Sequence, residues 1–291
     1  MTNDIFDKIS HQYPKFSKGQ KKIADYITDN YDKAAFMTAA VLSEKVGVSC
    51  STVVRFAVEL GYDGYPVLQE SLQRMVRTKL TSVQRMEVTS ARMGNSDILS
   101  TILNYDIAKI RQTLEDIDKD AFNSAITTIL NAKKIYILGV RSASALAQFL
   151  YFYLNLIFDN IVIVNATSVG EMFEQLLRIG ENDVLIAISF PRYSSRTVKA
   201  VKYASNNKAS VVAITDSENS PLNEFSTHTL IARSDIASFV DSLVAPLSVI
   251  NALVAGLGMR KKDEVSKTFE KLEKIWDEYD VYKNAENVNE K

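Results

Sequence analysis

KIYILGVRSASALAQFLYFYLNLIF, residues 134–158, is the stretch of sequence that decides the fold. Its first seven residues are mostly apolar and rich in isoleucine and valine, which predicts a strand buried on both faces. After a short polar turn, the apolar residues from Ala143 onward predict a buried helix. A strand followed directly by a helix is the repeating unit of a parallel sheet.

Four similar apolar runs continue this pattern along the chain. They are NIVIVNA (160–166), DVLIAIS (183–189), ASVVAIT (209–215) and HTLIA (228–232). Helical stretches such as RTVKAVKYASNN (196–207) separate the first four of the five runs. The alternation predicts an α/β doubly wound domain with a five-stranded parallel sheet, covered on both faces.

Helical segments flank these strands in the sequence. Before the first strand, six apolar residues follow one another at intervals of four, four, three, four and three positions. This spacing predicts a helix with one long apolar stripe that packs on the following domain or on a partner subunit. The stripe consists of Leu99, Leu103, Ile107, Ile110, Leu114 and Ile117. The segments 238–259 and 263–279 are also helical by period and close the chain. The second domain is therefore expected to span 97–291.

The first 80 residues predict an all-α head. Its expected helices lie in SKGQKKIADYITDNY (17–31), TAAVLSEKV (38–46), STVVRFAVELGY (51–62) and PVLQESLQRMVRTKL (66–80). Each segment starts at a capping residue or a proline and has apolar positions three or four apart. Residues 81–96 lose both this periodicity and the large aliphatic side chains, so we expect a linker there.

Two of these helices have the spacing of a helix-turn-helix. Leu42 and Val46 share one face of the first helix, and Gly47 provides a turn residue that tolerates a positive φ. Val53 and Phe56 place the apolar edge of the second helix against the first. The spacing therefore predicts a DNA-binding head.

The opposite face of the second helix is polar and suits a major groove. Ser49 is the expected N-cap, and Ser51, Thr52 and Arg55 form an outward stripe. Short hydroxyl side chains allow close approach, and Arg55 can donate two hydrogen bonds to a guanine edge or a phosphate. Lys18, at the start of an earlier helix, is the expected contact to the DNA backbone.

The stretch LSEKVGVSCSTVVRFAVELGYDGYPVLQESL (42–72) resembles the amino-terminal helix-turn-helix of the RpiR/MurR regulators. The similarity includes the Ser-x-x-Thr-Val-x-Arg-Phe run and the Leu-Gly-Tyr-x-Gly-Tyr that follows it. It spans nearly the whole head. The resemblance implies binding to a double-stranded DNA operator, with Ser51, Thr52 and Arg55 on the recognition helix.

Serine clusters follow the first and third predicted strands. Ser142 and Ser144 lie where a helix begins, and backbone N–H groups at such a position attract anions. ISFPRYSSRT (188–197) repeats the arrangement. Because both corners lie at carboxyl ends of parallel strands, they predict a ligand crevice suited to a sugar phosphate. The remaining candidate side chains for this crevice are Ser189, Arg192, Ser194, Ser195 and Thr197.

Residues 130–260 resemble the sugar isomerase domain. The resemblance implies a phosphosugar site at the two serine corners and dimerisation through this domain, with the pairing of dimers into a tetramer left open. The family's loop is Ser-x-Ser-Gly-acid-Thr, whereas SFPRYSSRT (189–197) is longer and has Ser195 and Arg196 at the Gly and acid positions. Hydroxyl contacts carry over to Ser189, Ser194 and Thr197, and the shape of the pocket differs.

Composition narrows the functional classes. Residues 1–92 carry 13 Lys and Arg against 10 Asp and Glu, and the rest of the chain carries 21 against 25, which favours the head for polyanion binding. The acidic start MTNDIFDKIS and the absence of about 18 consecutive apolar residues predict a cytoplasmic protein that does not enter a membrane. The single Cys50 and the two histidines predict neither a disulfide framework nor a metal site, and we expect no cofactor.

Three functions are consistent with these features. We favour a DNA-binding transcriptional regulator controlled by a sugar phosphate, which is not an enzyme. The alternative is a phosphosugar isomerase with an accessory helical domain, which needs a paired acid and base. Candidates for that pair are His228, Glu171 and Glu174, and none of them forms a convincing pair. A structural dimerisation protein would leave the serine corners without a role.

Overall fold

The computed structural model describes residues 5–79, 81–93, 97–234 and 240–282. The described residues fall into two compact units, one within 1–105 and 235–242 and the other within 106–234 and 243–291. No described helix is long and apolar enough to cross a membrane.

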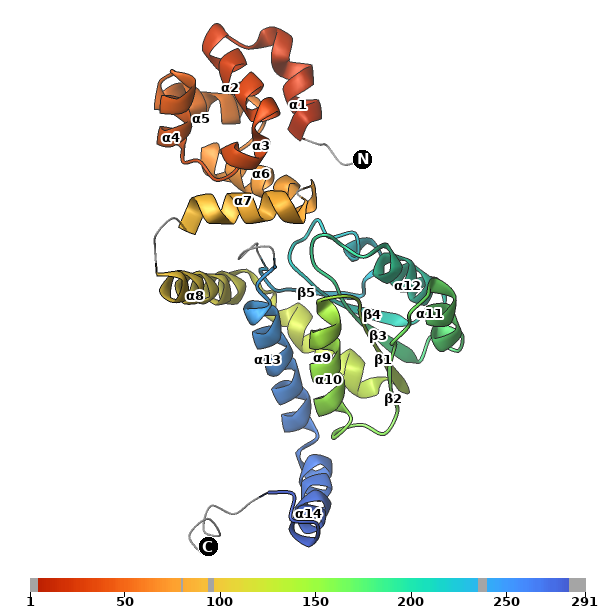
Figure 1. The fold of residues 1–291 in the computed structure, drawn as a ribbon. Helices are drawn as coiled ribbons and strands as arrows, with labels where there is room; N and C mark the ends of the chain where they lie inside the picture. Colours follow the sequence, from red (N-terminus) through yellow and green to blue (C-terminus); the bar gives the residue numbers. More distant parts are fainter. Residues whose placement is uncertain (1–4, 80, 94–96, 235–239, 283–291) are drawn as a thin grey trace, which may run out of the picture. The chain divides into compact units, whose positions relative to one another are not determined.

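Up to residue 105, the regular secondary structure of the described residues in the first unit is helical, as predicted (Figure 1). Its core is built from side chains that are fully buried, among them Ile23, Leu42, Val53, Phe56 and Leu68. The amino-terminal helix and the single-turn α3 were not predicted from sequence. The helices of this unit are α1 (Ile5–Gln12), α2 (Lys18–Asp29), α3 (Tyr31–Ala34), α4 (Ala39–Val46), α5 (Cys50–Glu59), α6 (Tyr65–Lys79) and α7 (Ser82–Met93), with a 3-10 turn at Tyr13–Lys15.

Helix α7 occupies most of the stretch that we expected to be a linker. Thr81 and Gln84 form a capping box, because Gln84 N donates to Thr81 Oγ1 (3.3 Å) and Thr81 N donates to Gln84 Oε1 (3.0 Å). Arg85 then forms an ion pair of 2.8 Å with Asp241. Local capping and this pair, which is distant in sequence, account for a helix where apolar periodicity is weak.

The second unit contains the predicted five-stranded parallel sheet, in the order β2-β1-β3-β4-β5. Strand β1 lies between β2 and β3, and its last residue, Gly139, is paired with Ile188 of β3. The chain therefore leaves β1 toward one side of the sheet and later returns on the other, which makes the β1/β3 boundary its topological switch point. The strands are β1 (Lys134–Gly139), β2 (Ile161–Ile163), β3 (Asp183–Ile188), β4 (Ser210–Thr215) and β5 (His228–Ile231).

Helices cover both faces of this sheet (Figure 1). Ile135 and Ile137 of β1 pack with α9 (Lys119–Asn131), α10 (Ala143–Leu154) and α13 (Val244–Arg260). The alternate residues Tyr136 and Leu138 pack with α11 (Val169–Leu176) and α12 (Ser195–Asn206). Burial on both faces explains why the strands are continuous apolar runs.

Two further helices belong to the predicted flanking segments. Helix α8 (Ile98–Asp116) carries the first five residues of the apolar stripe, and all five are exposed. Helix α13 begins at Val244 rather than at 238, and residues 238–239 of the predicted helix lie outside the described residues. Helix α14 (Lys262–Glu278) follows α13 directly.

Candidate recognition helix and ligand-binding edge

Helices α4 and α5 form the predicted helix-turn-helix. Gly47 ends α4 in the left-handed conformation (φ 71°, ψ 48°), where a side chain would be strained. Ser49 is the N-cap of α5, since its Oγ accepts a hydrogen bond from Thr52 N at 3.2 Å. Val53 and Phe56 are fully buried, so the opposite face of α5 is left to solvent.

The predicted polar stripe gathers at the exposed start of α5. Ser49 Oγ lies 2.9 Å from Ser51 Oγ and 2.7 Å from Thr52 Oγ1. Arg55 is exposed one turn later, and its Nε donates to Ser51 O at 3.4 Å, so the side chain lies along the helix toward these hydroxyls. The hydroxyls and the guanidinium therefore form one continuous polar surface.

Lys18 lies at the start of a helix that packs beside this surface. It is the first residue of α2 and is exposed. A Cβ on the adjacent Gly19 would lie 3.4 Å from Thr52 Cγ2, which shows how closely α2 approaches the start of α5. The structure therefore brings Lys18, the predicted backbone contact, near the start of α5.

Two exposed valines on α5 were missed by the sequence analysis. Val54 and Val58 are exposed and lie one turn apart, next in sequence to Arg55 and Glu59. Apolar side chains on a recognition helix can contact the methyl group of thymine. Their spacing of four residues outside the buried stripe was the available signal.

The first serine corner lies at the carboxyl end of β1. The turn is tight, because a Cβ on Gly139 would overlap with Ala143 O. Arg141 adopts a positive φ of 60°, and its carbonyl accepts hydrogen bonds from the backbone N (3.0 Å) and Oγ (2.6 Å) of Ser144. Ser142 is exposed and makes no side-chain capping bond. The first turn of α10 thus presents the Ser142 hydroxyl to solvent.

The second corner is the β3–α12 loop, residues 189–194. Ser189 is buried, and its Oγ accepts a hydrogen bond from Ser194 N at 3.4 Å, which closes the loop. Ser194 occupies the N-cap position of α12, but its side chain makes no capping hydrogen bond. Thr197, in the first turn of α12, is 0% exposed, and its hydroxyl has no hydrogen-bond partner among the described residues. The other two candidates, Arg192 and Ser195, are both exposed.

The neighbouring β2–α11 turn also reaches this edge. The guanidinium of Arg196, in the first turn of α12, donates to Thr167 O at 3.0 Å. Glu171 accepts hydrogen bonds from the N (2.8 Å) and Oγ1 (2.9 Å) of Thr167, and these bonds lower the pKa of the Glu171 carboxyl. We call this region, made of residues 140–144, 165–168 and 189–197, the β1/β3 edge.

Tyr193 and Asp216 were not identified from sequence. Tyr193 lies within the β3–α12 loop and donates a hydrogen bond of 2.7 Å to Asp216 Oδ1, in the turn after β4. Burial and the Asp216 carboxylate both raise the pKa of the Tyr193 phenol. The phenol therefore remains a donor and ties the loop to the next strand end.

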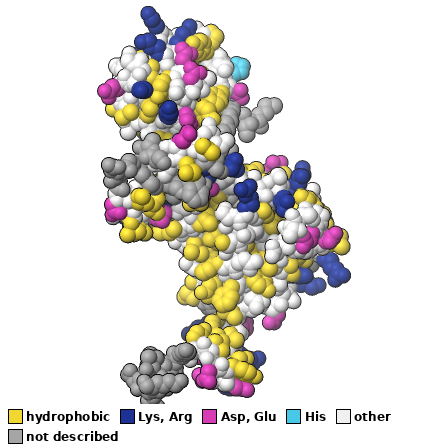
Figure 2. Space-filling model, in the orientation of Figure 1, with side chains coloured by type: hydrophobic (Ala, Val, Ile, Leu, Met, Phe, Trp, Pro, Cys, Tyr) yellow, Lys and Arg dark blue, Asp and Glu magenta, His cyan; other side chains and the backbone are white. Residues whose placement is uncertain are grey.

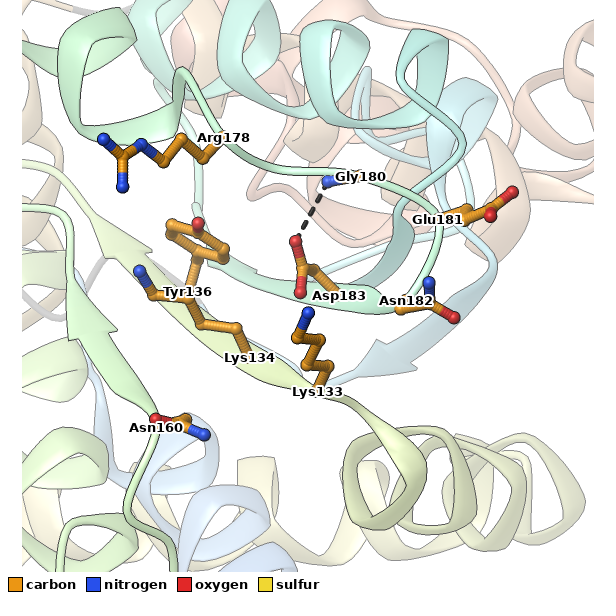
Figure 3. Close-up of a pocket in the computed structure, with 9 residues that line it drawn as sticks. All are labelled: Lys133, Lys134, Tyr136, Asn160, Arg178, Gly180, Glu181, Asn182 and Asp183. Atoms are coloured by element: carbon orange, nitrogen blue, oxygen red, sulfur yellow. Dashed lines mark hydrogen bonds between the residues drawn. The ribbon is translucent and has the colours of Figure 1, made fainter.

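A different hollow, of about 470 Å³, lies at the opposite end of the strands (Figure 3). Its charged residues include Lys133, Lys134 and Arg178, together with Asp183, which accepts a hydrogen bond from Gly180 N at 3.0 Å. Ligands of open parallel sheets bind at the carboxyl ends of the strands, so this hollow is not the predicted ligand site. The described residues contain no group of three or more His, Cys, Asp or Glu that could hold a metal ion.

Comparison with known proteins agrees with this two-part organisation. The family described as "Helix-turn-helix domain, rpiR family" matches residues 3–79, and the SIS domain matches residues 128–256. An uncharacterized HTH-type transcriptional regulator of Clostridium perfringens is 23% identical over 228 residues, which cover 78% of this chain and 80% of that protein. HexR, an HTH-type transcriptional regulator of Escherichia coli, is 24% identical over 271 residues, 89% of each chain.

A solved structure has the same fold over nearly the whole chain. The NanR protein of Vibrio vulnificus, solved in complex with ManNAc-6P, is 23% identical and has a TM-score of 0.58, covering 93% of this chain and 98% of that chain. A helix-turn-helix head joined to a SIS domain defines a class of DNA-binding transcriptional regulators. The chain belongs to the RpiR family of these regulators.

Proposed function

We propose that this regulator binds an operator through α5 and that a sugar phosphate, bound at the β1/β3 edge, controls its affinity for DNA. The observation that carries the proposal is the convergence of two helix starts, α10 and α12, at the carboxyl ends of adjacent strands. Helix starts attract phosphate, and serine hydroxyls can exchange hydrogen bonds with both phosphate and sugar.

Individual residues support this assignment. Ser142 and Ser194 lack side-chain capping bonds and are free to donate to a ligand. The buried hydroxyl of Thr197 without a partner is energetically unfavourable, which fits a loop that rearranges when a ligand binds. The exposed Arg192 can provide a cation for the phosphate.

We propose binding without catalysis, because two of the three candidate acid and base groups, His228 and Glu171, make other contacts. His228 begins β5, at the end of the sheet opposite the β1/β3 edge, and its Nε2 lies 2.9 Å from Thr128 Oγ1. The Glu171 carboxylate accepts bonds from Thr167, and its lowered pKa is the opposite of what a general acid requires. An isomerase needs a group with a raised pKa at the sugar carbons.

A homodimer completes the proposal. Figure 2 shows hydrophobic side chains gathered over α10 and α13. The large exposed hydrophobic residues of these two helices include Phe152, Tyr153, Val244 and Met259. Helices α8, α9 and α13 also line an apolar hollow of about 290 Å³. A second copy of the chain is the occupant we propose for this surface, because two heads are needed for a symmetric operator.

The effector is tested by thermal unfolding of the full chain with glucose 6-phosphate, fructose 6-phosphate, glucosamine 6-phosphate and ManNAc-6P. A compound present at 100 times its Kd stabilises the folded state by about 2.7 kcal/mol. We expect one compound to raise the melting temperature, while inorganic phosphate and unphosphorylated glucose do not. The same compound should change operator affinity and should not be converted to another sugar phosphate.

Two variants locate the site. Ser194→Ala should reduce the thermal shift and leave effector-free operator binding unchanged, whereas Ser205→Ala, in the last turn of the same helix, serves as the control. If no compound shifts the melting temperature, the effector proposal is wrong. Measured turnover of the compound would instead support the isomerase.

A further inference from the structure

Arg233 connects two parts of the second unit that are far apart in sequence. It follows β5, and its Nε forms an ion pair of 2.6 Å with Asp116 Oδ2 in the last turn of α8. Its backbone N donates to Thr113 Oγ1 of the same helix at 2.9 Å. On the other side, Arg233 Nη1 donates to Asp216 O at 3.1 Å, and Nη2 lies 3.4 Å from Glu218 Oε1. Arg233 thus joins α8 to the turn after β4.

The Arg233 side chain is well placed to hold α8 and the turn after β4 in fixed positions. Only 14% of the Arg233 side chain is exposed, so its ion pair with Asp116 is partly shielded from water. The planar guanidinium directs its donors at fixed angles toward the helix and toward the turn. A movement of one partner therefore disturbs the bonds to the other.

The turn after β4 is also the turn that holds the ligand loop. Asp216 is 2% exposed, and its carboxylate accepts the hydrogen bond from Tyr193, while its carbonyl accepts from Arg233. Tyr193 lies between Arg192 and Ser194, both of which we propose as ligand contacts. A ligand that draws these neighbours toward itself must either carry Tyr193 along or break its bond to Asp216.

Helix α8 leads toward the head along the chain. It runs without interruption from Ile98 to Asp116, and the residues before it belong to the expected linker and the DNA-binding head. The four linked side chains, Asp116, Tyr193, Asp216 and Arg233, all lie within one compact unit. We infer that the Tyr193–Asp216–Arg233–Asp116 chain of contacts passes the state of the ligand loop to α8. Arg233 acts as the positioning residue of this link.

This inference rests on the proposed function, but its first test needs no ligand. In the effector-free full chain, Tyr193→Phe removes the hydroxyl that donates to Asp216 and keeps the ring. We expect faster amide hydrogen exchange in the loop 189–194 and also in residues 112–117 at the end of α8. Arg233→Gln should produce the reciprocal effect in the loop. Faster exchange confined to each variant's own element would overturn the link.

Arg260→Gln is the matched control for these measurements. Arg260 also makes a side-chain hydrogen bond within this unit, from Nη1 to Thr127 Oγ1 at 3.0 Å, but among the described residues it has no hydrogen bond to the loop or to α8. It should leave exchange in 189–194 and in 112–117 at the wild-type rates. A control that accelerates both segments would show general loosening rather than a specific link and would also overturn the inference.

A second test uses the sugar phosphate that gives the largest thermal shift and an operator selected from random duplex DNA. In the wild type, this compound should change operator Kd by a factor of about 5 to 150, the usual range of allosteric coupling. Tyr193→Phe and Arg233→Gln should each still bind the sugar phosphate and the operator, but the compound should change their operator Kd by a factor close to one. If the variants retain the wild-type change in operator Kd, the inferred link is wrong and the proposed function still stands. If the compound does not change operator Kd even in the wild type, the proposed function is wrong.

Discussion

At the scale of single residues, Arg55 is the side chain on which operator sequence preference should depend most. It is exposed on α5, and its guanidinium can donate two hydrogen bonds to one guanine. We expect Arg55→Ala to weaken binding to the selected operator by about 1 to 3 kcal/mol, and to affect non-specific duplex DNA much less. Fluorescence anisotropy with both duplexes at one fixed salt concentration measures this difference.

Arg178→Ala is the comparison for this prediction, because Arg178 is an equally positive and exposed side chain outside the head (Figure 3). It should leave both DNA affinities unchanged. An equal loss of affinity for operator and non-specific DNA in Arg55→Ala would mean that Arg55 contacts only phosphates. Unchanged operator binding would mean that α5 is not the recognition helix.

At the scale of secondary-structure elements, Ser49 caps the start of α5, and we propose that the same residue also lies at the DNA interface. Ser49→Ala removes the capping bond to Thr52 N and should destabilise the protein by about 1 kcal/mol. For a unit of this size, such a loss lowers the melting temperature of the head by roughly 4 to 8 °C. Ser49→Asp should retain the cap and the melting temperature but weaken DNA binding, because its carboxylate faces the phosphates. Equal melting temperatures for Ser49→Ala and the wild type would show that this cap contributes nothing.

The same scale shows why some elements were predictable from sequence and others were not. The five strands and the α4–α5 pair are encoded by apolar period, caps and Gly47, which are local signals. The weak periodicity of 81–96 led us to expect a linker there. Helix α7 forms in this stretch instead, through a capping box and the pairing of Arg85 with Asp241, 156 residues away. Tyr193 and Arg233 were missed for a similar reason, because their partners become neighbours only after the sheet has formed.

At the scale of the whole molecule, the proposed dimer predicts that DNA binding depends on a surface far along the chain from α5. Leu114 is 66% exposed and lines the apolar hollow between α8, α9 and α13. Leu114→Glu would place a charge in the proposed interface without disturbing the core of the monomer. We expect sedimentation velocity to show monomers, and operator affinity to fall because two heads no longer bind together.

Leu177→Glu separates this effect from a general change in surface charge. Leu177 is 69% exposed, almost the same as Leu114. It is the C-cap of α11, which belongs to the helix layer on the other face of the sheet. This variant should sediment as the wild type and retain full operator affinity. If Leu114→Glu also sediments as the wild type, the second copy does not bind at this hollow. If it becomes monomeric yet binds the operator with wild-type affinity, then one head is sufficient, and the link from the ligand loop through α8 must act within a single chain.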